Sequence, residues 1–391
     1  MQKKLIALAV AGLVSGAAFA QSNVTIYGVM DATYDNVQAN SATAGSGNNY
    51  NSRGRTTFNS SYIGFKGSES LGNGLTAVFQ IETGIGEDPS GSFGSVGNKN
   101  YGWANRDTMI ALAGGFGTIA FGNITGPTRL LGNVMDPNAG ATGIGANTAL
   151  LGKMGGGSGA GVFDQRLANA IAYISPTFNG FYGVVGYQPN ESRSLDTSAN
   201  STDISAWTLG GVYSGGPILA GLTWTKAKDS DGHGGIAYNN NTVGTLALDD
   251  ASDIRAAFRY DFGIATVGIM YDRMKATINA GNDAKQDVWY IPVTFKLGNG
   301  KIIGQYGWAQ KVKVGGNDVD DTKAKHFEIG YEYNLSKRTM VKALWSQITN
   351  DAKASYDFLY GVSDSTTTSY GAGVKPGADP RGLSVGIRHS F

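Results

Sequence analysis

The stretch RGLSVGIRHSF, residues 381–391, ends the chain and decides the fold. From Leu383 onward, every second residue is apolar or aromatic, namely Leu383, Val385, Ile387, His389 and Phe391. The residues between them are polar, charged or glycine. Alternation with a period of two predicts a β-strand with two different faces. Because chain ends are usually polar and frayed, a strand that ends on an aromatic residue predicts a neighbouring strand that holds it.

The same alternation recurs along the chain in segments of about ten residues, a length that suits a tilted strand crossing a bilayer. Sixteen segments are predicted, at residues 24–35, 61–69, 75–83, 105–113, 117–124, 169–175, 181–188, 204–213, 218–227, 253–261, 263–274, 287–297, 301–312, 326–333, 338–348 and 381–391. Short turns such as LGNG (71–74) and GGFG (114–117) alternate with long polar linkers. An even strand number with this alternation is typical of an all-β, closed antiparallel transmembrane barrel with long external loops.

The two parities of these segments predict which face meets lipid. Charged residues fall opposite the apolar parity, for example Arg255, Arg259, Lys296 and Arg388. Charges on that face need water, and sixteen strands leave room for an aqueous channel. A soluble β-sandwich, the alternative, would have shorter strands and an apolar face turned into a core.

The N-terminus predicts export. Lys3 and Lys4 precede an apolar run, and Ala18-Phe19-Ala20 resembles a cleavage site, so residues 1–20 are predicted to be a signal peptide and residues 21–391 the barrel. Cleavage would change the formal net charge from +1 to −1, too balanced for a nucleic-acid partner. The chain has no cysteine, so it has no disulfides. No later apolar run is long enough for a spanning helix.

The sequence argues against several chemical functions. The glycine-rich stretch 140–161 contains no GK[ST] sequence, which argues against a phosphate-binding loop. His233, His326 and His389 are far apart without a ligand pattern, so neither a metal nor a cofactor is predicted. No nucleophile–histidine motif is present, so the chain is predicted not to be an enzyme. A lipid-hydrolysing barrel and an adhesion barrel stay open as alternatives.

Specific motifs resemble a known family. They are SNVTIYGVMDA (22–32), SYIGFKGSESLGNGL (61–75), AVFQIE (77–82), RDTMIALAGGFGTIAFGN (106–123), NAIAYISPTFNGF (169–181), YNLSKRTMVKALW (333–345) and PRGLSVGIRHSF (380–391). Together they resemble the general porins of Gram-negative outer membranes, most closely the Neisseria and Burkholderia type. The resemblance covers nearly the whole chain after residue 20.

The resemblance implies an outer-membrane location and a homotrimer of sixteen-stranded barrels. The third long loop, about residues 125–168, would fold inward and narrow the channel. Such proteins pass ions and small hydrophilic solutes passively, by size exclusion and electrostatics. A substrate-selective channel is the alternative within this class. The terminal Phe391 resembles the signal that outer-membrane assembly machinery reads.

The resemblance also implies a constriction with arginines on the second, fourth and sixth strands. Arg106 and Arg166 match the fourth and sixth, Tyr62 stands at the second, and Asn123 replaces a further basic residue. Two missing cations predict weaker anion selectivity. The inward loop would oppose the arginines with Asp136 and Asp164 and add positive charge through Arg129 and Lys153. Parity places three more candidates on the wet face, namely Asp31, Lys66 and Glu82.

Overall fold

The computed structural model of the chain describes residues 23–85, 103–191, 204–229, 250–278, 282–362 and 373–391. It also describes the backbone of four short strands, β5 (Ser95–Val96), β6 (Lys99–Asn100), β14 (Ala237–Asn240) and β15 (Gly244–Ala247). The predicted signal peptide lies outside these residues and stays a prediction.

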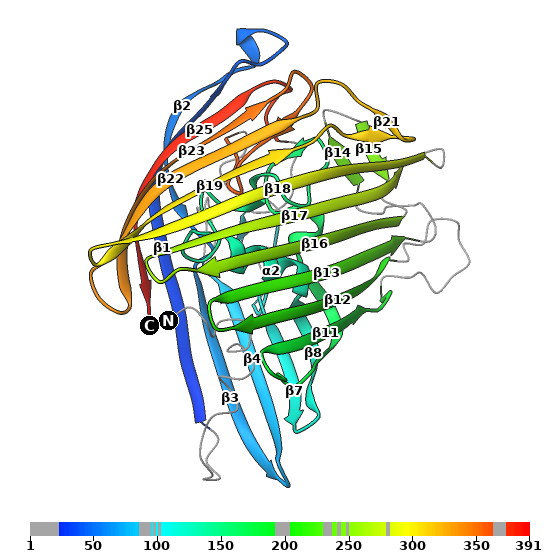
Figure 1. Cartoon of the computed structure of the whole chain (residues 1–391), viewed down its shortest axis with the longest axis vertical. Helices are drawn as coiled ribbons and strands as arrows, with labels where there is room; N and C mark the ends of the chain where they lie inside the picture. The colour runs from blue at the N-terminus through cyan, green and yellow to red at the C-terminus, as the bar shows by residue number, and fades with distance from the viewer. Residues whose placement is uncertain are drawn as a thin grey trace.

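Sixteen antiparallel strands form a closed barrel, which confirms the predicted fold class (Figure 1). In chain order they are β1 (Asn23–Asn40), β3 (Tyr62–Gly72), β4 (Leu75–Gly84), β7 (Thr108–Gly114), β8 (Gly117–Thr125), β10 (Arg166–Ile174), β11 (Phe181–Gln188), β12 (Ile204–Gly215), β13 (Ile218–Asp229), β16 (Asp250–Asp261), β17 (Ala265–Ile278), β18 (Asn282–Leu297), β19 (Gly300–Ala309), β22 (Ala324–Asn334), β23 (Thr339–Asn350) and β25 (Asp379–Ser390). Each predicted segment overlaps one of them.

The first and last strands close the barrel, as the terminal alternation predicts. β1 pairs with β25 from Val29 opposite Ser390 to Asn40 opposite Asp379. Beyond the ladder, the N–H of Phe391 donates to the carbonyl of Gly28 at 3.1 Å, and the reverse bond is 3.2 Å. A closed ring of strands leaves no open edge on which another chain could pair.

The second barrel strand is divided into two pieces. The first half of β1 pairs with β3, and its second half pairs with β2 (Tyr50–Phe58). β2 therefore continues the barrel wall beyond Tyr62, the first residue of β3 (Figure 1). The short helix η1 (Ser46–Asn48) lies in the connection between β1 and β2. The stretch YNSRGRTTF has no alternation of apolar residues, so sequence periodicity does not reveal this extension.

The apolar parity faces outward, as predicted. Exposed apolar side chains on β16, β18 and β25 include Ile254, Phe258, Ile291, Val293, Phe295, Leu297, Leu383, Val385 and Ile387. The opposite parity carries Arg255, which is fully buried inside the barrel. Lipid must therefore cover the outer surface, whereas the interior holds the charges.

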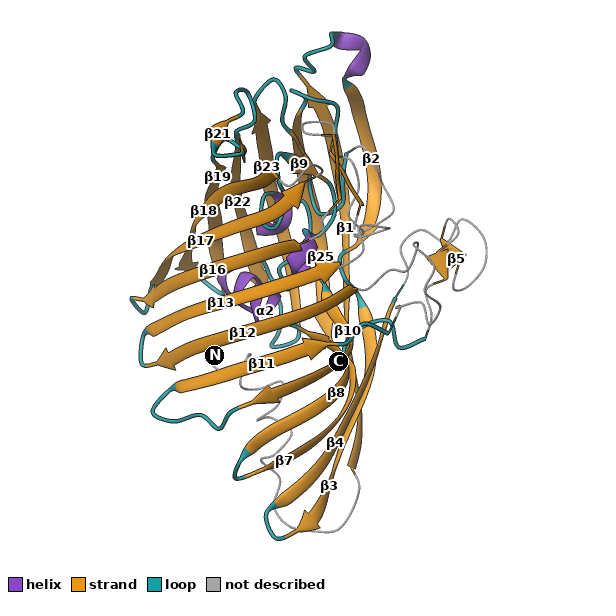
Figure 2. Cartoon of the chain, turned by 90° about the vertical axis from the view of Figure 1, so that its right-hand side faces the viewer, coloured by secondary structure: helices purple, strands orange, loops and turns teal. Residues whose placement is uncertain are grey.

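The third long loop folds into the barrel, where Figure 2 shows α2 behind the wall of strands. Its elements are α2 (Pro127–Met135), η2 (Asn147–Ala149), β9 (Gly156–Gly157) and η3 (Val162–Asp164). Glycines let α2 approach the wall. A Cβ at Gly221 of β13 would lie 2.7 Å from Leu131, and one at Gly268 of β17 would lie 2.7 Å from Met135. Glycine in a strand commonly marks such a close approach.

The last long loop packs against the third one. Its β24 (Ser355–Tyr356) pairs in parallel with β9. Tyr356 and Phe358 are fully buried in one apolar cluster with Leu150 and Leu151. The two loops therefore share a small core inside the barrel, which fixes the shape of the narrowed section.

Two further strands, β20 (Lys313–Val314) and β21 (Asn317–Asp318), extend the sheet beyond β19. In the part of the chain that the structure describes, the helices are too short or too polar to cross a membrane.

Candidate functional site

A cluster of arginines and acids lies where the third loop leaves and rejoins the wall. Arg106 precedes β7, and its Nε lies 3.5 Å from the Glu82 carboxylate on β4. Arg166 begins β10 and forms an ion pair of 3.1 Å with Asp107. The hydroxyl and the backbone N–H of Thr125 also donate to Asp107, each at 2.7 Å. The structure thus brings Arg106, Arg166 and Glu82 together and adds Asp107.

Tyr62 lies beside this cluster. The Arg106 guanidinium lies 4.7 Å from the Tyr62 ring centroid, and Tyr27 meets that ring edge-on at 6.1 Å. The Tyr27 hydroxyl donates to Glu82 at 2.8 Å, and the Lys66 ammonium lies 4.9 Å from the Tyr27 centroid. Three of the predicted site residues, Tyr62, Lys66 and Glu82, therefore belong to one chain of contacts with Arg106.

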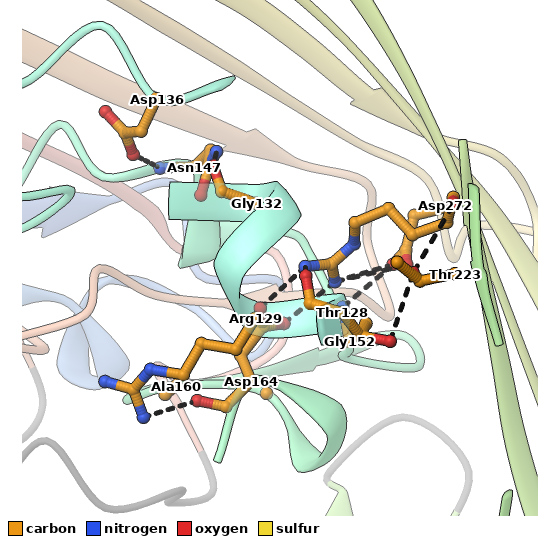
Figure 3. Close-up of polar contacts among 12 residues, drawn as sticks. Thr128, Arg129, Gly132, Asp136, Asn147, Gly152, Ala160, Asp164, Thr223 and Asp272 are labelled. Atoms are coloured by element: carbon orange, nitrogen blue, oxygen red, sulfur yellow. Dashed lines mark hydrogen bonds and ion pairs between the residues drawn. The ribbon is translucent and has the colours of Figure 1, made fainter. Parts of the chain in front are cut away.

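Arg129 adds a third arginine from α2. Its guanidinium donates to the backbone carbonyl of Asp164 at 2.8 Å (Figure 3). Burial and the neighbouring charges of Arg166 and Arg106 lower the pKa of Arg129 to about 10. A guanidinium with this pKa is still charged at neutral pH, so three cations meet at this point.

Asp164 anchors the loop to the opposite wall. Its carboxylate accepts two hydrogen bonds from Arg255 of β16, at 2.7 and 2.9 Å. Asp272 of β17 pairs with the same guanidinium at 3.3 Å, and Arg255 also donates to the carbonyl of Thr128. The Asp164 carboxylate therefore faces Arg255 rather than Arg106 or Arg166, and Figure 3 shows it under the helix near Thr128 and Asp272.

Asp136 stabilises the turn after α2. Its carboxylate accepts bonds from the N–H of Asn147 at 2.7 Å and from the N–H and amide of Asn138 at 2.9 and 2.8 Å. Burial raises the pKa of Asp136 to about 6, against the effect of these hydrogen bonds. Asn138 also donates to Glu328 of β22. Asp136 thus binds its own loop and does not contact the arginine cluster.

Lys153 is fully buried where the third loop meets the last one. Its ammonium donates to the carbonyls of Ala149 at 3.2 Å and Asp357 at 3.0 Å. Burial lowers the pKa of Lys153 to about 7. Lys153 therefore joins the two loops and is shielded from solvent between them.

Asp31 forms a second charged group on the inner wall. It is completely buried and pairs with Lys342 of β23 at 2.7 Å and with Arg388 of β25 at 2.9 Å. A Cβ at Gly140, in the third loop, would lie 2.7 Å from the Arg388 guanidinium. The tip of the loop therefore touches this group.

Five charged residues that form ion pairs in these groups are absent from the predicted site: Asp107, Arg255, Asp272, Lys342 and Arg388. Asp107 directly follows Arg106 in the sequence, and strand parity places Arg255 and Arg388 on the inner face. Sequence spacing, however, carries no information on which wall residues the third loop contacts. Among the described residues, no group of three or more histidine, cysteine, aspartate or glutamate side chains is arranged to hold a metal ion.

Comparisons with known proteins agree with this geometry. A family model described as Gram-negative porin matches residues 7–353. Outer membrane porin protein 32 of Delftia acidovorans is 31% identical over 397 residues, covering 100% of both chains. A major outer membrane protein P.IB of Neisseria gonorrhoeae is 28% identical and covers 89% of this chain and 94% of its own.

Solved structures are also similar. An anion-selective porin from Comamonas acidovorans matches with a TM-score of 0.73 and 27% identity, over 95% of this chain and 100% of that one. The trimer form of OmpT, a Vibrio cholerae outer membrane protein, matches with a TM-score of 0.64 and 14% identity, over 95% and 99%. At that identity the second match concerns the fold alone.

Proposed function

Because this chain belongs to the Gram-negative porins and is an outer-membrane diffusion channel, we propose that its narrow section favours small hydrophilic anions. The observation that carries the proposal is the grouping of Arg106 and Arg166 at the inner wall with Arg129 of α2, which is bonded to the carbonyl of Asp164, two residues before Arg166. Passage is passive, with no bond made or broken. Side-chain charge and the width left by the third loop determine which solutes pass.

The acids near this point are already occupied, which supports a net positive potential. Glu82 lies against Arg106, and Asp107 is bonded to Arg166 and Thr125. Asp164, which sequence reasoning sets against the arginines, is held by Arg255 instead. Three guanidiniums therefore face two carboxylates, and an anion that enters supplies the missing negative charge. Water-lined walls of one sign raise the local concentration of the opposite ion.

Arg388 partly compensates for the arginine that is missing at the position of Tyr62. Arg388 lies opposite Asp31 on β1, two residues after Val29, which lies opposite Tyr62, and Arg106 covers the Tyr62 ring from the β7 side. Arg388 is shared with Asp31, so its contribution is smaller than that of an unshared arginine. Positive charge thus continues along the wall across the position of Tyr62. The similar solved porin described as anion-selective agrees with this proposal.

We further propose that three copies assemble into a homotrimer surrounded by outer-membrane lipid, each barrel conducting independently. The trimer form of a structurally similar outer membrane protein supports this proposal. The Gram-negative porins and their fold are known as non-enzymatic channels, and we propose the same for this chain.

The reversal potential in a salt gradient tests the proposal. Purified protein is reconstituted into a planar bilayer with different KCl concentrations on the two sides. We expect steps in groups of three and a reversal potential of the sign given by chloride. A potential of the sign given by potassium would contradict the anion preference, and no conduction would contradict an open channel and favour an adhesion barrel. Saturation by one solute would indicate a substrate-selective channel instead.

A further inference from the structure

Two tyrosine rings line the inner wall beside the arginine cluster. Tyr27 of β1 shares the inward parity of the buried Asp31, and Tyr62 of β3 lies opposite Val29, which has the same parity. Both tyrosines are partly exposed, and their rings meet edge to face with centroids 6.1 Å apart. The inner wall therefore presents aromatic surface to the channel as well as charge.

Glycines leave room for the two rings. Gly64 of β3 lies opposite Tyr27, and a Cβ at this glycine would lie 2.6 Å from the Tyr27 ring. Gly84 of β4 lies opposite Tyr62, and a Cβ there would lie 3.8 Å from the Cδ of Arg106. Glycine within a strand commonly marks a close approach of this kind. No side chain from either position therefore covers the rings.

The side chain of Arg106 donates no hydrogen bond to any of the described residues. Its Nε lies 3.5 Å from the Glu82 carboxylate without forming a hydrogen bond. Glu82 instead accepts hydrogen bonds from the Tyr27 hydroxyl at 2.8 Å and from the Gln80 amide at 3.0 Å. The Arg106 side chain is 19% exposed, and a guanidinium carries five N–H donors. Arg106 therefore keeps donors for a solute that reaches it.

These features fit one class of solute. The N–H donors of a guanidinium lie in one plane and match the two oxygens of a carboxylate. The Arg106 guanidinium already lies over the Tyr62 ring, 4.7 Å from its centroid, and guanidiniums and tyrosines both attract flat aromatic rings. An aromatic carboxylate uses the charge and the flat surface together, whereas an aliphatic carboxylate uses the charge alone.

We propose that Tyr27, Tyr62 and Arg106, which we call the tyrosine–arginine group, bind aromatic monocarboxylates such as benzoate during their passage. This inference rests on the anion preference proposed above and names the solutes that it favours most. The carboxylate accepts hydrogen bonds from Arg106, and the ring of the solute lies against the tyrosines. A favourable aromatic contact raises affinity by roughly two- to tenfold. An arginine in place of Tyr62 would add charge but remove this ring.

Single-channel currents in planar bilayers test the proposal. The chloride current through the purified protein is titrated with benzoate or with cyclohexanecarboxylate, which has the same charge and a six-membered ring that is not flat. We expect benzoate to halve the current at a concentration at least about threefold lower. Y62L should remove this difference, whereas Y62F keeps the ring and should retain it. The matched control is Y306L, because Tyr306 is exposed on the outer face of β19, where it contacts Trp308. Y306L should also retain the difference.

Three results would overturn the proposal: equal half-blocking concentrations of the two acids in the parent, an unchanged difference in Y62L, or equal blocking by the neutral benzamide. The comparison of the two acids in the parent is decisive even if Y62L does not assemble. The reversal potential in KCl, measured in the same bilayers, separates this inference from the anion preference. A potential of the chloride sign with equal blocking by the two acids would contradict only the aromatic site. A potential of the potassium sign would contradict the anion preference itself.

Discussion

The guanidinium of Arg106 lies over the ring of Tyr62, 4.7 Å from its centroid. The family resemblance implies an arginine at the position of Tyr62, and in this chain that position instead supports the next arginine along the wall. A cation–π contact of this kind contributes about 0.5–2 kcal/mol, depending on its solvation. The aromatic ring therefore fixes a cation that would otherwise be free to turn.

Replacing Tyr62 with arginine adds a charge at this position, and we expect Y62R to shift the reversal potential in a KCl gradient toward anions. The two guanidiniums would repel each other, so Arg106 would also turn away from the wall. Y62F keeps the ring and serves as the control, with no shift expected. If Y62R behaved like the parent, the position would not face the ion path.

Removing arginines from the cluster should have the opposite effect. R106Q and R166Q each leave a carboxylate, Glu82 or Asp107, without its cation, and we expect both variants to shift the reversal potential toward cations. The control is R273Q, since Arg273 lies on the outer face of β17 and is exposed. A shift in R273Q as large as that in R106Q would mean that the potential reports overall charge.

The buried Arg255 should hold the third loop in place. R255M leaves Asp164 and Asp272 buried without their shared cation, and breaking such a pair costs roughly 3–5 kcal/mol. We expect a lower unfolding temperature and noisier channel currents, because the loop loses its anchor on β16. R255K keeps the positive charge but cannot donate the two parallel hydrogen bonds to Asp164. Its unfolding temperature and current noise should lie between those of the parent and R255M. Quiet currents in R255M would show that the remaining loop contacts suffice.

Lys153 predicts a pH dependence of stability. Burial lowers its pKa to about 7 from 10.5, so between these values the unfolded chain binds a proton that the folded chain does not. The free energy of unfolding should therefore rise with pH from 7 to 9, by at most about 1.4 kcal/mol per pH unit. Guanidinium unfolding curves at pH 7 and 9 measure this rise. The unfolding free energy of K153M should rise less between pH 7 and 9. An equal rise in the parent and in K153M would exclude Lys153 as the group responsible for the pH dependence.

Gly28 leaves the space that the end of the chain occupies. A Cβ at this position would lie 2.4 Å from the Phe391 ring and 2.6 Å from the carbonyl of Tyr62. We expect G28A to slow barrel assembly and to cost about 1–3 kcal/mol, as overpacking usually does. G211A is the matched control, since nothing lies within 4 Å of its Cβ. Normal assembly of G28A would mean that the Phe391 ring moves aside freely.

The variant F391A should impair barrel assembly more than it changes the conductance of the barrels that form.

Much of the wall could be predicted from the sequence, because a strand with one face in lipid and one in water must alternate. The segments around Leu383 and Ile254 show this alternation, and the structure places both in the barrel. β2 could not be predicted, because its backbone pairs with β1 without an apolar face of its own.

The interior could be predicted only in part. Position in a motif identifies Arg106 and Arg166, but the partners of Asp136 and Asp164 depend on how a glycine-rich loop folds in three dimensions. Asp164 meets Arg255, which is 91 residues later in the chain, and no local pattern encodes that distance. The role of the predicted residues in the constriction stays a prediction that the variants above test.

The two-residue ladder between β9 and β24 has a consequence for the order of events during folding. It joins Gly156 to Ser355, so the narrow section cannot take its final form until nearly the whole chain has arrived. The strand that follows, β25, is also the one that completes the ring with β1. The pairing of β25 with β1, which closes the barrel, and the pairing of β24 with β9, which fixes the shape of the narrow section, therefore belong to the same late stage of folding. A chain that stopped before β24 would have two free sheet edges and a third loop without its partner, so it would form neither a closed barrel nor the final aperture.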